Sequence, residues 1–108
     1  MLLEKEQRAL QRFKEILNRR FGSEIKALRL FGSKARNDAR SDSDIDVLVV
    51  TRQDDWRLKE EIGKVATLIL LEEGIYLSVK VLGEPSYQRL TRLASPFLKN
   101  ISRDGISL

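Results

Sequence analysis

Two neighbouring stretches decide the fold: LFGSKAR at residues 30–36 and SDSDIDVLVV at residues 41–50. In the first stretch, an apolar run ends in a Gly-Ser turn that a basic segment follows. In the second, two aspartates one residue apart open an apolar run with the composition of a buried strand. Together they predict a strand at residues 25–31, a short helix after Ser33 and a second strand at residues 44–51.

Longer helices are expected before and after this unit. Apolar residues at helical spacing predict a first helix that ends at Gly22. Asp54 and Asp55 can cap a later helix, which ends at Gly74. Trp56, at the start of that helix, is expected to be a partly buried packing residue. The expected core positions are Leu3, Leu10, Phe13, Leu17 and Phe21 in the first helix, and Leu58, Ile62, Val65 and Ile69 in the later one.

The last third of the chain continues the alternation of strand and helix. A third strand is expected at residues 75–82, and the turn at residues 83–85 leads into a helical stretch. Pro96 separates this stretch from a last apolar segment, and residues 103–108 either add a short strand or fray. Leu90 and Leu93 of the helical stretch are expected to face inward, and the last apolar segment contains Phe97, Leu98 and Ile101.

This order of elements predicts an α/β (α+β) fold in a single domain spanning residues 1–108. We expect a small mixed sheet of three to four strands with helices mainly on one face. The edge of the sheet that carries the acidic pair is expected to stay open to a ligand.

The acidic pair is the main candidate for a functional site. Side chains at alternate strand positions point the same way, so Asp44 and Asp46 are expected to lie on one side, roughly 6–7 Å apart along the strand. Two like charges beside an apolar run repel each other, and a divalent cation offsets that cost. Mg²⁺ suits two carboxylates because it takes its other ligands from phosphates and water.

The Gly-Ser turn and the basic segment supply complementary groups. Gly32 allows a tight turn with exposed backbone N–H groups, and Ser33 adds a hydroxyl donor. Lys34, Arg36 and Arg40 follow in a segment that reads as a helix starting at the turn, which favours bound anions. Alone, each feature has an ordinary interpretation as a turn, a solvated helix face or a capping acid; their conjunction within 19 residues indicates a nucleotide site.

Composition excludes several chemistries. The chain has neither histidine nor cysteine, so Ser-His-Asp hydrolysis, thiolate metal sites and disulfides are ruled out. Residues 1–40 carry eleven Lys or Arg against five Asp or Glu, an excess that could attract a triphosphate, RNA or an acidic protein. No run is long enough to cross a membrane and the start does not resemble a signal peptide, so we expect a cytoplasmic protein.

At Gly32-Ser33, Lys34-Ala35-Arg36 and Asp44-Ile45-Asp46 the chain resembles the minimal nucleotidyltransferases of the DNA polymerase beta superfamily. The resemblance implies a nucleotidyltransferase fold and a Mg²⁺-dependent enzyme. It implies transfer of a nucleoside monophosphate, most simply AMP from ATP, to a protein or nucleic-acid hydroxyl. Asp44 and Asp46 would be the catalytic and metal-binding residues, and Gly32, Ser33, Lys34 and Arg36 would bind the nucleotide.

One departure from the family pattern concerns the third strand. Active members commonly place a third carboxylate there, whereas residues 75–82 contain no acid. Ser78 or Lys80 is expected in that position, with Asp42 and Glu84 as candidate substitutes.

Two functions therefore stay open. The resemblance implies a transferase that serves as the antitoxin of a helical HEPN-type partner. The alternative is a catalytically weak or inactive fold that binds and neutralises such a partner. Neither base preference nor the acceptor can be read from these residues.

Overall fold

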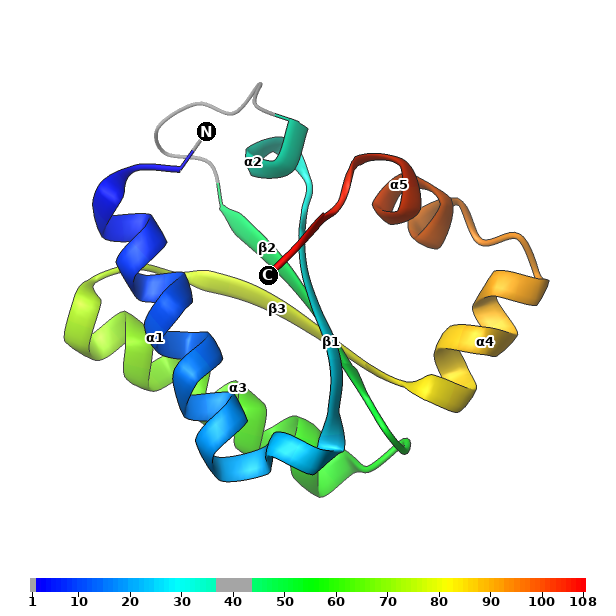
Figure 1. The fold of residues 1–108 in the computed structure, drawn as a ribbon, viewed down its shortest axis with the longest axis horizontal. Coiled ribbons are helices and arrows are strands. Elements are labelled where there is room, and N and C mark those ends of the chain that lie inside the picture. Colours follow the sequence, from blue (N-terminus) through cyan, green and yellow to red (C-terminus); the bar gives the residue numbers. More distant parts are fainter. Residues whose placement is uncertain (1, 37–43) are drawn as a thin grey trace.

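The computed structural model describes residues 2–36 and 44–108 (Figure 1). Arg40 and Asp42, two of the residues singled out above, lie outside this part of the chain. The elements are α1 (Glu4–Phe21), η1 (Gly22–Glu24), β1 (Ile25–Phe31), α2 (Ser33–Arg36), β2 (Ile45–Thr51), α3 (Trp56–Glu73), β3 (Leu77–Gly83), α4 (Glu84–Arg92), α5 (Pro96–Asp104) and β4 (Ile106–Ser107).

The strands form a mixed four-stranded sheet in the order β3-β2-β1-β4. β1 runs antiparallel to β2 and β4, while β2 and β3 run parallel. Because a parallel pair needs a crossover, α3 connects β2 to β3. The mixed α/β fold expected from the sequence is confirmed, and the C-terminal tail does add a short strand, β4.

The two long helices, α1 and α3, cover one face of the sheet, hereafter the α1/α3 face. Their apolar stripes pack on alternate residues of β2, because successive side chains of a strand point to opposite faces. Figure 1 shows α1 and α3 together on one side of the strands. Fully or nearly fully buried members of this core include Leu10, Phe13, Leu17, Ile45, Val47, Val49, Ile62, Val65 and Ile69.

A smaller apolar cluster covers part of the opposite face, hereafter the α5 face. Leu48 and Val50 of β2 pack there against Leu98 and Ile101 of α5. Helices therefore lie on both faces, with the larger layer on the α1/α3 face. Asp46, Leu48 and Val50 are alternate residues of β2, so the side chain of Asp46 points to the α5 face as theirs do. Asp46 is not a member of the apolar cluster on this face.

The ends of α3 explain why it starts and stops where the sequence predicts. Asp55 Oδ1 accepts hydrogen bonds from the backbone N–H groups of Arg57 and Leu58 at 2.9 and 3.3 Å. Gly74 ends the helix with a φ of 69°, and its N–H donates to the carbonyl of Leu70.

Two expected core positions, Leu3 and Leu93, and the expected packing of Trp56 are wrong. Leu93 is 71% exposed because α4 ends at Arg92, and Leu3 is 46% exposed because it precedes the first turn of α1. Trp56 is 68% exposed and lies beside the guanidinium of Arg57, 5.4 Å from the ring centroid, instead of packing into the core.

Within the part of the chain that the structure describes, no helix combines the length and the apolar character that crossing a membrane requires. The cytoplasmic location expected from the sequence stays a prediction.

Candidate functional site

The turn after β1 lies directly against the acidic pair. Phe31, the last residue of β1, is the register partner of Asp46 on β2. Gly32 follows with a φ of 75°, and a Cβ placed on it would collide with Asp46 Oδ2. Only glycine combines this backbone conformation with so close an approach of the carboxylate. The sequence placed these two residues in one site, and the fold brings them into contact.

Asp46 is a partly buried carboxylate with a like charge nearby. Burial raises its pKa above the ordinary value of 3.8, and the negative charge of Asp44 raises it further. A hydrogen bond from the Ser78 hydroxyl and the positive charges of Lys80 and Arg36 lower the pKa in part. Asp44 itself is exposed and lies immediately before β2. The expected repulsion between the two aspartates is therefore present.

The raised pKa of Asp46 predicts a pH-dependent stability. The folded protein holds this proton more tightly than the unfolded chain, so the free energy of unfolding falls as pH rises from 3.8 through the folded pKa. At neutral pH, Asp46→Asn is expected to be more stable than wild type, and the difference should vanish below pH 3.8. Urea unfolding of both proteins at neutral and acidic pH measures it. A variant less stable than wild type at neutral pH would contradict the prediction.

The short helix α2 places the residues that follow the turn. The N–H of Arg36 donates to the carbonyl of Gly32 at 3.2 Å, which closes the single turn. Ser33 is its first residue and is partly exposed, and Arg36 is exposed. Arg36 also lowers the pKa of Asp46, so its guanidinium lies within electrostatic reach of that carboxylate.

Lys34, the second residue of α2, pairs with a residue of α1. Its side chain is buried, and Nζ pairs with Glu6 of α1 at 3.1 Å to Oε2 and 3.3 Å to Oε1. Glu6 Oε1 also accepts the backbone N–H of Leu3 at 2.8 Å. The sequence indicates that Lys34 binds the nucleotide or, taken alone, lies on a solvated helix face. In the structure it joins α2 to the start of α1, and a contact of Lys34 with nucleotide stays a prediction.

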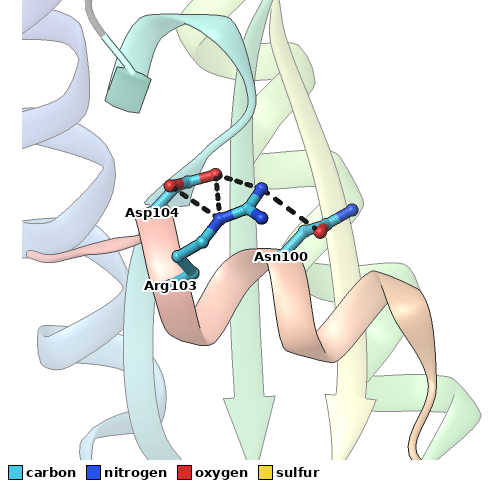
Figure 2. Close-up of polar contacts among 3 residues, drawn as sticks. All are labelled: Asn100, Arg103 and Asp104. Carbon is cyan, nitrogen blue, oxygen red and sulfur yellow. Dashed lines mark hydrogen bonds and ion pairs between the residues drawn. The ribbon is translucent and has the colours of Figure 1, made fainter.

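The C-terminal end of α5 lies within electrostatic reach of Arg36, which the sequence did not indicate. The hydrogen bond that Arg103 donates is the main cause that lowers the pKa of Asp104, and the positive charge of Arg36 lowers it further. Figure 2 shows Arg103 between Asp104 and Asn100, with its Nη2 3.0 Å from Asp104 Oδ2 and 3.4 Å from Asn100 Oδ1. Locally this segment reads as an ordinary helix end, so only the fold reveals its proximity to Arg36.

The third strand places a hydroxyl beside the acidic pair. Ser78 is the register partner of Asp46, and Lys80 follows on the same face two residues further along β3. The prediction that Glu84 could replace the missing third carboxylate is wrong. Glu84 follows Gly83, which lies at the other end of β3, about 16 Å along the strand from Ser78. It pairs there with Lys26 at 3.8 Å. Asp42 lies outside the described residues.

The donor set fits a magnesium ion that brings further ligands with it. The carboxylates of Asp44 and Asp46 are hard oxygen donors at the end of β2 that the Gly32 turn adjoins. Among residues 2–36 and 44–108 no group of three or more His, Cys, Asp or Glu side chains forms a metal-binding cluster. A cation held by Asp44 and Asp46 would therefore need its remaining ligands from a substrate or from water.

Gly32→Ala tests the contact between turn and acid. Gly74→Ala is the matched control, since Gly74 has a similar positive φ of 69° with nothing within 4 Å of an added Cβ. Both variants carry the backbone strain, but only Gly32→Ala adds the collision with Asp46, which we expect to lower the free energy of unfolding by roughly 1–2 kcal/mol more. Chemical denaturation measures the difference. An equal decrease in the free energy of unfolding of the two variants would show that the Gly32 turn is not in close contact with Asp46.

The fold and this site define a nucleotidyltransferase domain. Residues 10–101 match the family described as "Nucleotidyltransferase domain", and the chain belongs to that family. It is similar to a protein of Methanocaldococcus jannaschii named "Putative protein adenylyltransferase MJ0604", with 29% identity over 100 residues that cover 93% of this chain and 94% of that protein.

Solved structures share the fold. One, described as "Structure of putative minimal nucleotidyltransferase", is 25% identical, has a TM-score of 0.58 and matches 98% of this chain and 97% of its own. Another, "Crystal structure of the toxin-antitoxin with AMP-PNP", is 19% identical, has a TM-score of 0.57 and matches 97% of this chain and 72% of its own. At that identity the second likeness concerns the fold alone.

Proposed function

We propose that this protein transfers a nucleoside monophosphate from a triphosphate to a hydroxyl group of an acceptor macromolecule. The observation that carries the proposal is the contact between the Gly32 turn and Asp46, with Asp44 beside it. A turn that presents backbone N–H groups next to two carboxylates can hold a polyphosphate and its cation together.

Each residue of the site has a distinct task in this proposal. Gly32 and Ser33 bind phosphate oxygens, Arg36 adds positive charge, and Asp44 and Asp46 are the catalytic and cation-binding residues. The acceptor hydroxyl oxygen forms a bond to the α-phosphorus while the bond from the α-phosphorus to the oxygen that bridges to the β-phosphate breaks. Pyrophosphate leaves with that oxygen, and the proton of the hydroxyl is released to water. When bound, Mg²⁺ would neutralise negative charge on the transferring and leaving phosphates.

The transferred nucleotide is proposed to be AMP and the acceptor a protein. The name of the Methanocaldococcus jannaschii relative, a protein adenylyltransferase, supports both points. A nucleic-acid acceptor is less well supported, although the basic first third of the chain would tolerate one. The proposed partner is a helical HEPN-type protein that this domain modifies or masks as an antitoxin, in keeping with the toxin–antitoxin structure that shares the fold.

The test is a transfer assay with α-³²P-labelled ATP, Mg²⁺ and the purified product of the adjacent gene as acceptor. We expect label on the acceptor that requires Mg²⁺ and is lost with excess chelator. Competition by the other three unlabelled nucleoside triphosphates measures base preference. Absence of transfer, together with absence of ATP binding in equilibrium dialysis, would reject the proposal.

A second candidate function rests on β3. With Ser78 and Lys80 where an acid would strengthen the cation site, the fold could bind the partner without modifying it. Complex formation with the partner, ATP binding without transfer, and unchanged neutralisation of the partner by Asp46→Asn would favour this alternative.

A further inference from the structure

The geometry points to a site that takes one divalent cation per nucleotide, in which the ammonium group of Lys80 supplies a second, permanent positive charge for the phosphates. This inference rests on the proposed function, because it specifies how many cations accompany the triphosphate. It concerns two side chains of β3, Ser78 and Lys80, that lie on the same face as Asp46.

The register of the parallel strands fixes these positions. Asp46 pairs with Ser78 and Leu48 pairs with Lys80, while Leu77 belongs to the core of the α1/α3 face. Ser78 and Lys80 therefore point to the α5 face, as Asp46 does. Neighbouring strands lie about 4.8 Å apart and alternate residues roughly 6–7 Å apart. The flexible stem of Lys80 spans such a separation, and its side chain is exposed.

Ser78 lies beside Asp46 in the register of β2 and β3. Its hydroxyl is neutral, and it is the oxygen that β3 places next to Asp46. A neutral hydroxyl is a weak ligand for Mg²⁺ compared with a carboxylate, since it brings no charge to offset the dehydration of the ion. One cation can bind between Asp44 and Asp46, but a second on the Ser78 side would lack an anionic protein ligand.

The charges of the side chains near Asp46 also favour a single cation. Asp44 and Asp46 carry two negative charges, and Lys80 and Arg36 carry two positive charges within electrostatic reach of Asp46. A second cation on the Ser78 side would be repelled by the positive charge of Lys80, whereas the ammonium group can donate to a phosphate oxygen. Lys80 therefore supplies on that side the positive charge that a second ion would otherwise bring.

The experiment counts bound Mn²⁺ by electron paramagnetic resonance in the presence of α,β-methylene-ATP, which cannot undergo transfer. We expect one Mn²⁺ per protein–nucleotide complex for wild type and for Ser78→Asn, the neutral control. The double variant Ser78→Asp/Lys80→Ala, which adds an acid and removes the ammonium, is expected to bind two. Lys80→Met alone should keep one Mn²⁺ and weaken nucleotide binding by about tenfold.

The outcomes separate this inference from the proposed function. Two Mn²⁺ ions on wild type, or unchanged nucleotide affinity in Lys80→Met, would overturn the inference and leave the proposed function standing. No Mn²⁺–nucleotide binding by wild type would overturn both. If the double variant does not fold, the wild-type count and the affinity of Lys80→Met decide the matter alone.

Discussion

Asp46→Asn is expected to lower nucleotidyl transfer by about 10³-fold or more while the fold stays intact. Asn has the same shape, but it loses the negative charge that would hold the cation beside the Gly32 turn in the proposed function. Loss of several kcal/mol of electrostatic stabilisation of the transferring phosphate corresponds to a rate loss of this size. Initial rates of label transfer at saturating acceptor measure the effect.

Asp54→Asn is the matched control for this substitution. Asp54 is an exposed aspartate beside Gly83, which lies at the opposite end of the β2–β3 pair from Asp46. Asp54→Asn changes the net charge by the same amount as Asp46→Asn. Any general effect of net charge on the encounter with the acceptor therefore appears in both variants. Equal activity of the two variants would mean that Asp46 has no special task, and the assignment of the site would fail.

The sequence predicts the positions of the turn and of the two acids, because these positions depend on the spacing of nearby residues. The strand at residues 25–31 is confirmed to the residue, and the turn and the acids fall at the ends of the neighbouring strands β1 and β2. Because β1 and β2 pair antiparallel with Phe31 opposite Asp46, the end of β1 and the start of β2 lie together. The contact between Gly32 and Asp46 therefore follows once these two strands pair.

Residues that depend on distant partners could not be placed in this way. β3 was expected to begin at residue 75, but pairing begins at Leu77 because its partner strand starts at Ile45. Lys34 reads locally as a solvated cation, and nothing in its own segment indicates an acid 28 positions earlier. Asp104 approaches Arg36 only because α5 folds back along β1.

The buried pair between Glu6 and Lys34 gives the largest expected effect on stability. Their side chains are 6% and 2% exposed, so Lys34→Ala leaves the Glu6 carboxylate buried without this ammonium group, and Glu6→Ala takes from Lys34 the carboxylate that pairs with it. Glu6→Ala or Lys34→Ala is expected to reduce the free energy of unfolding by about 3–5 kcal/mol. That is a large share of the roughly 5–15 kcal/mol typical of a small domain. Thermal and urea unfolding measure it.

An exposed ion pair on the same helix provides the control for this loss of stability. Glu4 and Arg8 of α1 are separated by 3.8 Å, with side chains 89% and 66% exposed. Solvent screens that pair, so Glu4→Ala should cost no more than about 0.5 kcal/mol. Similar losses for Glu4→Ala and Glu6→Ala would contradict a special contribution from the buried pair.

The double variant Glu6→Met/Lys34→Met separates the two tasks that Lys34 can have. Apolar side chains of similar length fill the same space without a buried charge, so stability should recover most of the loss seen in either alanine variant. If Lys34 acts only by joining α2 to α1, nucleotide affinity should recover together with stability, because the Gly32 turn is again held in place. If instead Lys34 leaves Glu6 to contact phosphate, the double variant will fold well and still bind nucleotide weakly. Isothermal titration with α,β-methylene-ATP on the three variants distinguishes these results, and it tests directly whether the lysine that follows the Gly-Ser turn belongs to the nucleotide site.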